Sequence, residues 1–517
     1  MQRVHFDRSQ LVKGIRMLAR TVLVTYGPTG KTVLMDRPAG IITTKDGATV
    51  ARELEFSHPV QNIGCQLARN ASLQVNNQAG DGTTTVICIL DILIQEGNKR
   101  IVAGVNRREF LQGIQMAGAA VTNAIPEVSQ EILVESVLAS VATVACNGDE
   151  KIGKMLAEAC FAVGKEGALI IEDGLNVDPV LEFRDGVVLE MQPLHFGFKS
   201  WDTPGEGRIM EGVQVALIDQ DLTSFEDVKA LMESAGQRPQ NELLVIARSV
   251  VGDALNTMVL NNGKDVVKCC ALAAPGRADQ QPEQLQDLAA LAGTIVVDPQ
   301  RGQDVRKWDE QWFGSMRKVT VKDKHVVFET YPEAEQDIRV RVQQLERDLE
   351  KLEDGYDRDQ MQKRIANLSG GLALIKVGGW TEAAMKERRA RIEDALAAVQ
   401  GALAEGVMPG GGVAYIVLGR MSARPVMTEA QRQGWDVVMK ALSGPFRRLA
   451  GTNATEQDIT SMWTSDHWVG WDARKGMLRD LRLSPSILDP ANVVRTVIQV
   501  ALSAGTMVLS TDVVVLK

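Results

Sequence analysis

The stretch at residues 25–32, TYGPTGKT, ends in the Gly-Lys-Thr triplet that closes a phosphate-binding P-loop. A P-loop also needs a glycine five residues before Gly30, where the backbone must approach phosphate closely, and Thr25 stands there. The flanks are reversed as well, because residues 11–24 predict a helix and residues 33–38 predict a strand stopped by proline. The pattern argues against a P-loop. It leaves open a plain helix-to-strand turn, or a glycine–proline turn that presents backbone N–H groups to phosphate.

A second anion-binding pattern is GDGTTT at residues 80–85, directly before an apolar helical run. The glycines let the backbone approach an anion. The threonine hydroxyls and N–H groups would lie at a helix N-terminus, where the helix dipole favours phosphate. Asp81 could supply an oxygen ligand to Mg²⁺. A simple N-cap is the alternative, but one capping residue suffices for that, so three threonines favour a phosphate site.

Three other polar positions could take part in the same chemistry. The turn at 44–47 (TKDG) is either an exposed turn or a place where Lys45 contacts phosphate and Asp46 an attacking water. The glycines at 410–412 either end a helix or allow a ligand to approach closely. Asp394 lies about 200° around its helix from Ile392, off the apolar stripe, so an exposed carboxylate is its simpler interpretation.

Helical periodicity is strong near both ends of the chain. Residues 59–76 and 85–96 predict helices on either side of a loop, and the second is apolar nearly all round, which predicts a buried helix. Residues 493–508 predict another apolar helix. In the middle, β-like runs alternate with helical ones, which predicts an α/β unit with a partly parallel sheet. The β-like runs lie at 168–173, 213–219, 242–247, 266–274 and 294–298.

A charged segment follows the α/β block. Residues 342–368 predict a helical hairpin with coiled-coil-like packing, because apolar residues repeat at helical spacing on both sides of a break at 353–355. The simplest arrangement of the whole chain packs its two helical ends into one domain and inserts the α/β block between them.

Bulk properties exclude several function classes. The chain has 517 residues, too many for one hydrophobic core, and a formal net charge of -9, which makes nucleic acid a poor partner. The longest apolar run, 86–94, is too short to cross a bilayer, so we expect no membrane partner. The spacing of the six cysteines fits neither a zinc site nor a disulfide framework, which predicts reduced, buried thiols. The first ten residues lack the apolar core of a signal peptide, so we expect a cytoplasmic protein.

Taken together and in order, these segments resemble the group I chaperonins, the GroEL family. The match runs nearly from end to end. The segments that carry it are TYGPTGKTVLMD, TTKDGATVARELE, NQAGDGTTT, NGDEKIGKMLAEACFAVGKEGALIIEDG, LSGGLALIKVGGWTE, RRARIEDALAAVQGALAEGVMPGGGVA and ILDPANVVR. The archaeal and eukaryotic chaperonins share GDGTTT but carry a built-in lid segment, for which this chain has no obvious insertion.

The resemblance implies a multidomain α+β and α/β chain with the GroEL-like chaperonin fold. The mostly helical equatorial, ATP-binding domain would contain residues 1–127 and 405–517, and the small intermediate hinge domain residues 128–184 and 373–404. The inserted α/β apical, substrate-binding domain would contain residues 185–372. The family forms homo-oligomeric rings, usually of seven subunits, around a cavity for unfolded polypeptide, and a co-chaperonin lid is a possible further partner.

The resemblance also assigns residues to an ATP site. Asp46 and Asp394 would position the water that attacks the γ-phosphate, and Asp81 would bind Mg²⁺, with K⁺ nearby. The other residues implied to contact nucleotide are Thr25, Tyr26, Gly27, Pro28, Lys45, Gly82, Thr83, Thr84, Thr85, Gly411, Asp472, Ala473 and Asp489. TYGPTGKT would thus meet nucleotide through its first four residues. Asp394 belongs to the implied hinge domain, so hydrolysis would depend on hinge closure.

The apical segment departs most from the family pattern. The family's substrate strand, R-G-Y-L-x-x-Y-F, stands here as MQPLHFGF at residues 191–198, and Lys229 replaces an apolar residue on the next helix. The residues that keep the implied polypeptide-binding character are Leu194, Phe198, Met232, Leu255, Val259 and Leu260. The groove is therefore expected to be less apolar than in the family.

The adenine side of the implied ATP site departs as well. The family's N-A-A motif stands here as Asp472-Ala473-Arg474, with a bulky arginine in place of alanine. Trp463, Trp468 and Trp471 crowd the same region. We therefore expect a shifted nucleotide preference or affinity.

The leading hypothesis is an ATP-dependent chaperonin that binds unfolded polypeptide and assists folding in a ring-shaped cavity, driven by ATP hydrolysis. It would act in the bacterial cytoplasm or, for a virus-encoded copy, in that of the host. The alternative is a ring-forming holdase or scaffold with weak or no ATPase activity, which the altered apical groove favours. The joint presence of Asp46, Asp81 and Asp394 favours the ATPase, because a scaffold needs no such carboxylates.

Overall fold

The computed structural model describes residues 2–5, 8–37, 40–132, 134–146, 148–164, 168–174, 176–184, 186–198, 207–237, 242–322, 325–352, 355–369, 372–461, 468–483 and 485–516. The chain forms two compact units. Unit 1 contains Met1–Phe161, Leu175–Pro179 and Val377–Lys517, and unit 2 contains Ala162–Gly174 and Val180–Lys376. Unit 1 thus joins both helical ends of the chain, as the simplest arrangement predicts. The three-domain boundaries implied by the resemblance stay a prediction.

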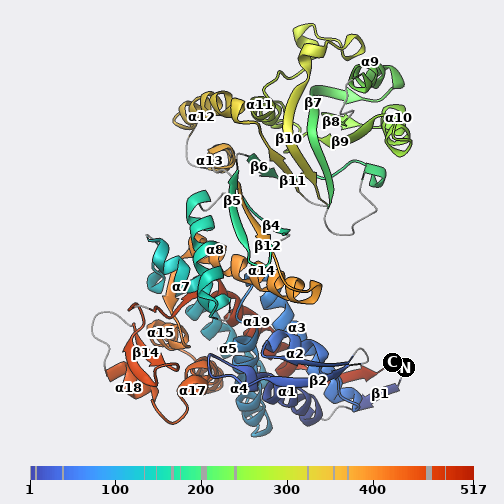
Figure 1. Ribbon diagram of the computed structural model, residues 1–517. Coiled ribbons are helices and arrows are strands. Elements are labelled where there is room, and N and C mark those ends of the chain that lie inside the picture. The colour runs from blue at the N-terminus through green and yellow to red at the C-terminus, as the bar shows by residue number, and fades with distance from the viewer. Residues whose placement is uncertain are drawn as a thin grey trace. The chain divides into compact units, whose positions relative to one another are not determined.

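Unit 1 is mainly helical (Figure 1). Its helices are α1 Arg8–Val22, α2 Gly47–Glu53, α3 Pro59–Ala79, α4 Thr83–Val102, α5 Arg107–Asn123, α6 Ile125–Val128, α7 Glu135–Ala145, α8 Glu150–Val163 (whose last residues fall in unit 2), α14 Glu382–Glu405, α15 Val413–Met421, α16 Glu429–Leu442, α17 Gly444–Ala450, α18 Glu456–Ser461 and α19 Ala491–Ser510. The predicted helices at 59–76, 85–96 and 493–508 are confirmed, each extended by a few residues.

The core of unit 1 surrounds α4. Val86, Ile89 and Leu93 of this helix are fully buried, as its nearly uniform apolar sequence predicts. α19 packs so closely on α4 that a Cβ added to Gly505 would collide with Leu93. Among the described residues α19 is also the helix long and apolar enough to cross a membrane. Because 56% of its most apolar window is buried inside the protein, its apolar composition is that of a core helix.

Among the residues that the structure describes, four short antiparallel ribbons complete unit 1. They pair β1 Gln2–His5 with β17 Val513–Leu516, β2 Val33–Arg37 with β3 Gly40–Thr44, β13 Val407–Pro409 with β16 Leu488–Pro490, and β14 Val469–Asp472 with β15 Met477–Asp480. The first ribbon brings the two ends of the chain together (Figure 1). The strand predicted after the TYGPTGKT turn is β2, and the helix predicted before it is α1.

Unit 2 contains a mixed six-stranded sheet in the order β6-β11-β10-β7-β8-β9. Its strands are β6 Gly186–Leu189, β7 Arg208–Leu222, β8 Glu242–Val250, β9 Lys268–Ala273, β10 Gly314–Val321 and β11 Val326–Glu329. The pairs β7–β8 and β8–β9 are parallel and the others antiparallel, which confirms the predicted partly parallel sheet. Its crossover helices α9 Phe225–Gly236 and α10 Gly252–Gly263 lie on one side of β7, β8 and β9, and α11 Gln281–Ala292 on the other (Figure 1).

One predicted strand is wrong. Residues 294–298 make a single bridge to β7, in which the Val297 N–H donates to the Leu217 carbonyl at 2.9 Å and its carbonyl accepts from Asp219 N at 2.8 Å. The pairing stops there because Asp298 caps a 3₁₀ turn, Pro299–Arg301, and proline cannot continue the ladder. The sequence of an apolar, strand-forming run therefore does not show how many of its residues pair with another strand.

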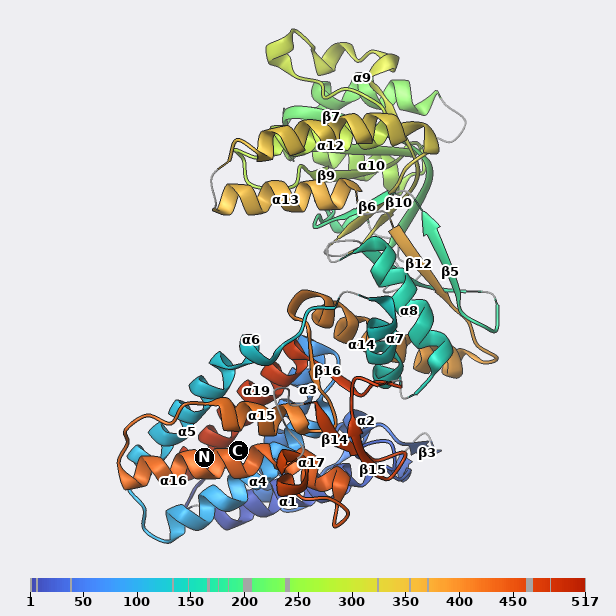
Figure 2. The same cartoon turned by 90° about the vertical axis from the view of Figure 1, so that its left-hand side faces the viewer.

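The predicted hairpin is confirmed as α12 Glu335–Leu349 and α13 Tyr356–Ser369, which lie antiparallel side by side (Figure 2). Part of the predicted break, 353–354, lies outside the described residues. Buried charges fix the hairpin to α11. Arg341 Nε donates to Asp287 Oδ1 at 2.8 Å, and Arg364 Nε to Asp287 Oδ2 at 2.7 Å. One carboxylate thus receives both guanidinium groups, which ties α12 and α13 to α11.

A second, three-stranded sheet of unit 2 contains β4 Ala168–Asp173, β12 Leu372–Val377 and β5 Val180–Arg184 in that order. β5 precedes β6 directly, and β12 follows α13. This sheet therefore holds both strands through which the chain enters and leaves the six-stranded part of unit 2. All six cysteines of the chain are buried and unpaired, as predicted.

Candidate functional site

The start of α4 has an exposed set of backbone donors. α3 ends in a left-handed Gly80 (φ 71°) and α4 begins after a left-handed Gly82 (φ 90°), conformations that glycine adopts without steric cost. No side chain of the described residues caps α4. The threonines at 83–85 are the first turn of the helix itself, so the N-cap interpretation of GDGTTT is wrong. The N–H groups of this turn and the helix dipole therefore stay available to an anion.

Two further segments meet this turn. A Cβ on Gly47 would collide with Thr84 Oγ1 and lie 3.2 Å from Thr25 Oγ1, so the three positions are in contact. The Tyr26 hydroxyl lies 3.2 Å from Thr85 Oγ1. The sequence TYGP therefore sits beside the first turn of α4, while the later Gly-Lys-Thr triplet leads into β2. Gly27 is left-handed (φ 75°) and packs on Leu449, and the neighbouring Pro28 offers its carbonyl to this region.

Lys45 and Asp46 stand between β3 and α2. Lys45 Nζ donates to the Pro28 carbonyl at 3.4 Å, which brings an ammonium group over the TYGP turn. Asp46 caps α2, accepting from Ala48 N at 3.1 Å and Thr49 N at 2.8 Å. These two backbone hydrogen bonds hold the Asp46 carboxylate in place. Its negative charge therefore has a fixed position relative to the other carboxylates of the site.

Asp394 is drawn into the site by α14. Asn76 Nδ2, one turn before GDGTTT on α3, donates to Asp394 Oδ1 at 3.3 Å. A Cβ on Gly80 would collide with the Asp394 carbonyl oxygen, so α14 approaches the loop as closely as glycine permits. Burial, and then the charges of Asp46 and Asp81, raise the pKa of Asp394 to about 6, although the Asn76 hydrogen bond opposes the shift. The simpler interpretation, an exposed carboxylate, is therefore wrong.

The glycines at 410–412 meet the segment ILDP through strand pairing. Met408 of β13 faces Asp489 of β16, and a Cβ on Gly410 would lie 3.0 Å from Asp489 Oδ1. Gly411 is left-handed (φ 64°), and a Cβ there would lie 3.6 Å from the Trp471 carbonyl oxygen. Burial and the nearby charge of Asp81 raise the pKa of Asp489 to about 7. Asp489 on β16 and Asp81 before α4 thus interact electrostatically although they are far apart in the sequence.

Asp81 is the centre of this negative cluster. Burial raises its pKa and the charge of Asp46 adds to the shift, although the Gly82 N–H, which donates to Asp81 Oδ1 at 2.6 Å, opposes it. The charge of Asp81 raises the pKa of both Asp394 and Asp489, and the charge of Asp46 raises that of Asp81 and Asp394. A cation would relieve this repulsion, so the residues fit Mg²⁺ held by few carboxylates together with phosphate oxygens. In the described residues no set of three potential ligands forms a closed metal site by itself.

The predicted adenine-side residues have a different local role. Asp472 is 2% exposed, and its carboxylate accepts from Arg479 Nε at 2.8 Å, Arg474 N at 2.9 Å and Lys475 N at 3.1 Å. These bonds close the β14–β15 turn and leave little of the carboxylate for a ligand. Ala473 follows in the same turn and is half-buried. Contacts of Asp472 and Ala473 with nucleotide stay a prediction. Trp463 lies outside the described residues.

Residues that sequence reasoning missed also belong to this site. Asn76 positions Asp394, and its place one helical turn before GDGTTT is a signal that could have indicated it. Tyr415 is buried at the start of α15, where Asp489, Tyr26 and Asp81 help burial to raise its pKa. Nothing in the sequence distinguishes Tyr415 from a core aromatic residue.

The predicted polypeptide-binding residues of unit 2 do not share one surface. Phe198 and Met232 are buried in the core, Leu194, Leu255 and Val259 are half-buried, and Leu260 is 61% exposed. Large apolar side chains that sequence reasoning missed are exposed around α9 and α10, namely Phe196, Phe225 and Val251. Lys229 is exposed too, with its Nζ 5.9 Å from the centre of the Phe225 ring. The 3₁₀ turn Phe196–Phe198 points one phenylalanine outward and one inward, which residue types alone do not reveal.

Comparison with known proteins identifies the family. The model of the TCP-1/cpn60 chaperonin family matches residues 18–517. Two crystal structures of the chaperonin gp146 from the bacteriophage EL 2 (Pseudomonas aeruginosa), both in the presence of ATP-BeFx, are similar in fold. The TM-score is 0.73 at 20% identity for one crystal form and 0.69 at 21% for the other, over 100% of this chain and 99% of that chain. The chain belongs to the TCP-1/cpn60 chaperonin family and has the GroEL-like chaperonin fold.

Proposed function

We propose that this chaperonin binds and hydrolyses ATP and uses the hydrolysis to assist the folding of polypeptides inside a ring. The observation that carries the proposal is the convergence of Asp46, Asp81, Asp394 and Asp489 beside the uncapped start of α4. Carboxylates whose charges act on Asp81, Asp394 and Asp489 beside a helix N-terminus are costly unless a cation and an anion bind together. The presence of an ATP analogue in the crystals of the gp146 chaperonin supports the same assignment.

Each residue of the site has its own role in binding or hydrolysis. The N–H groups at the start of α4 and Lys45 would hold the phosphates, and Asp81 would hold Mg²⁺, which when bound neutralises phosphate charge. K⁺ is proposed only from the family resemblance. Asp394 and Asp46 would orient the attacking water, since an ionised carboxylate accepts a hydrogen bond from water and fixes its direction. Gly411 and Asp489 would line the nucleoside side.

Asp394 makes this chemistry sensitive to the position of α14. Its carboxylate meets Asn76 and its carbonyl lies against Gly80, so a small shift of α14 relative to the 80–85 loop would remove it from the reacting water. We therefore propose that movement of the implied hinge segment, 373–404, controls turnover.

Ring assembly and client binding rest on separate surfaces. The ribbons β1–β17 and β2–β3 are each two strands wide and carry exposed apolar residues such as Leu34 and Val513. Two-stranded ribbons are only marginally stable alone. This supports the proposal that they pair with neighbouring subunits in a homo-oligomeric ring. Around α9 and α10, Phe196, Phe225 and Leu260 offer apolar surface to unfolded polypeptide and to a possible co-chaperonin lid. We propose a cytoplasmic site of action, which the six unpaired cysteines support.

The ATPase is tested by replacing Asp394 with asparagine. We expect Asp394→Asn to keep Mg-ATP affinity but to lower steady-state phosphate release by about tenfold or more, because a neutral amide orients water less well. Glu393→Gln is the matched control, since Glu393 neighbours Asp394 on α14 but pairs with Arg389 at 3.0 Å. Undiminished turnover in Asp394→Asn would remove this residue from the mechanism. A wild type that binds polypeptide without releasing phosphate would favour the holdase.

A further inference from the structure

The 3₁₀ turn Phe196–Phe198 is pinned between α10 and the edge strand β9. Its last residue, Phe198, is fully buried. Asn262 Nδ2 of α10 donates to the Gly197 carbonyl at 3.0 Å, and Asn262 Oδ1 accepts from Cys269 N of β9 at 3.2 Å. One amide side chain thus ties the turn to a helix and to the sheet, so the backbone of the turn has a fixed position.

The side chain of His195 closes the same turn. Its Nδ1 accepts a hydrogen bond from Gly197 N at 3.0 Å, which only a ring nitrogen without a proton can do. The imidazole also lies against the Phe196 ring, with the two centroids 4.3 Å apart and the planes tilted by 34°. A Cβ on Gly197 would lie 3.0 Å from both His195 Nδ1 and Val259 Cγ1, so glycine lets the turn fit between the imidazole and α10.

Phe196 is held by these contacts and is nevertheless 62% exposed. Leu260, which follows Val259 on α10, is 61% exposed and adds apolar area. An aromatic ring that is fixed before a partner arrives loses little conformational entropy on binding, so it makes an effective anchor. The polar groups of the turn offer little to a ligand, because His195 Nδ1 and both polar atoms of the Asn262 amide are already hydrogen-bonded. The surface therefore fits an apolar side chain of a partner.

We propose that His195 is a positioning residue, which holds Phe196 as a preformed anchor for an apolar side chain of an unfolded polypeptide. The proposal rests on the client binding proposed above and names one contact through which it occurs. Its physical basis is the hydrogen bond to Gly197 N. Without an acceptor at position 195 the turn can carry Phe196 in many orientations, so more entropy is lost when a client binds. The anchor therefore needs the acceptor rather than the imidazole ring as such.

Two substitutions of His195 in the full-length protein test the acceptor. His195→Asn offers a carbonyl oxygen to the Gly197 N–H, as in an Asx turn, whereas His195→Ala offers no acceptor. The probe is fluorescently labelled, carboxymethylated α-lactalbumin, a permanently unfolded polypeptide, titrated by anisotropy without nucleotide. We expect His195→Ala to weaken binding about fivefold and His195→Asn to restore most of the affinity. Equal affinities of the two variants would overturn the role of the acceptor.

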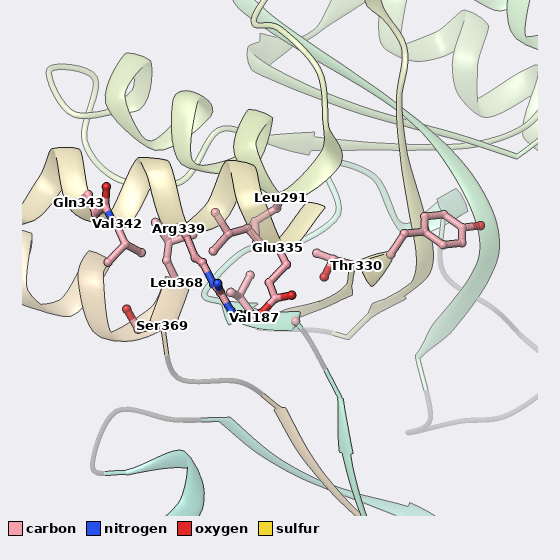
Figure 3. Close-up of a pocket in the computed structure, with 12 residues that line it drawn as sticks. Val187, Leu291, Thr330, Glu335, Arg339, Val342, Gln343, Leu368 and Ser369 are labelled. Carbon is pink, nitrogen blue, oxygen red and sulfur yellow. Dashed lines mark hydrogen bonds and ion pairs between the residues drawn. The ribbon is translucent and has the colours of Figure 1, made fainter. Parts of the chain in front are cut away.

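A double-mutant cycle tests whether His195 acts through Phe196. Phe196→Ser should weaken binding by a similar factor, and His195→Ala should add little in that background, because the anchor is already gone. The control is Val340→Ser, which removes a similarly exposed side chain (60%) from α12, a helix that forms one wall of a separate open cavity with α11 and β6 (Figure 3). The control should bind as wild type does. Additive losses, or an equal loss in the control, would overturn the proposal.

Hydrogen exchange tests the contact without any client. By mass spectrometry, peptides that cover residues 192–198 should exchange faster in His195→Ala than in the wild type or in His195→Asn, because the Gly197 N–H is released. Unchanged exchange in His195→Ala would show that His195 does not hold the turn. A wild type that shows this exchange pattern but does not bind the labelled polypeptide would contradict the proposed client binding, and the anchor with it, while leaving the hydrogen bond established.

Discussion

The proposed nucleotide site of unit 1 and the apolar surface of unit 2 could be predicted from the sequence to different degrees. In unit 1, Gly47 lies against Thr25, and the charge of Asp81 reaches Asp394, although these residues come from distant segments. In unit 2, the predicted client-binding residues are divided between core and surface, and Phe198 lies fully inside. The first site is defined by backbone approach and fixed charges, whereas the second depends on which way each side chain points.

This difference has a physical origin. Few other residues can replace a glycine with a left-handed backbone, or a carboxylate that binds the metal ion of a phosphate ligand. Residue type alone is therefore informative at such positions. An apolar surface needs only area, and phenylalanine serves as well inside as outside. The following predictions test whether unit 1 is as sensitive to single atoms, and unit 2 as tolerant, as this comparison implies.

The largest effect is expected at Asp81. Asp81→Asn keeps the shape of the side chain but removes the charge that would hold Mg²⁺, so Mg-ATP affinity should fall about a hundredfold or more by calorimetric titration. Asp36→Asn is the control, because Asp36 is an exposed carboxylate on β2 outside the cluster. Wild-type affinity in Asp81→Asn would mean that the carboxylate cluster does not hold the metal, and the comparison would lose its basis.

Alanine substitutions at Gly80 and Gly104 distinguish the cost of a steric collision from the cost of backbone strain. Both are left-handed, but a Cβ on Gly80 would collide with α14, whereas a Cβ on Gly104 would meet nothing within 4 Å. Gly104→Ala should lower the free energy of unfolding by about 1 kcal/mol from strain alone. Gly80→Ala should cost roughly 2–3 kcal/mol and also reduce turnover, because α14 must move. Denaturant titration and phosphate release measure the two effects, and equal behaviour of the variants would contradict the tight α14 contact.

Asp489 gives the site a pH signature in the nucleotide-free protein. Its raised pKa, about 7, means that the native carboxyl keeps its proton at pH values where the unfolded chain has already lost it. Stability is therefore lost as pH rises from about 4 to about 7. Asp489→Asn should remove this loss and raise the free energy of unfolding on the order of 1 kcal/mol at pH 8, with little change at pH 4. A variant that is no more stable than wild type at pH 8 would speak against a buried, repelled carboxylate.

The smallest effects are expected in unit 2. Lys229→Leu should tighten binding of a labelled unfolded polypeptide a few-fold, because it adds apolar area beside Phe225. Leu260→Ser should weaken the same binding by a similar factor, since this side chain is exposed. Fluorescence anisotropy at constant ionic strength measures both. If neither change alters affinity, clients bind elsewhere on the protein.

The sequence predicts most of the framework and part of the candidate site. Helical period and length identify α3, α4 and α19, and GDGTTT indicates an anion site without knowledge of its partners. The antiparallel strands β6, β10 and β11 were missed; the pairs β6–β11 and β10–β7 join segments far apart in sequence, and such pairing leaves no local signal. Burial raises the pKa values of Asp394 and Asp489, and the charge of Asp81 raises both further. These causes depend on the tertiary structure and cannot be seen in the sequence.

The packing of α19 on α4 has a consequence for biosynthesis. α4 emerges early from the ribosome, but the helix that covers it, α19, is translated only after all of unit 2. Unit 2, by contrast, is nearly continuous along the chain and can fold as soon as Lys376 has emerged. Unit 2 can therefore fold before unit 1 is complete, and the apolar flank of α4 stays uncovered until α19 has been synthesised.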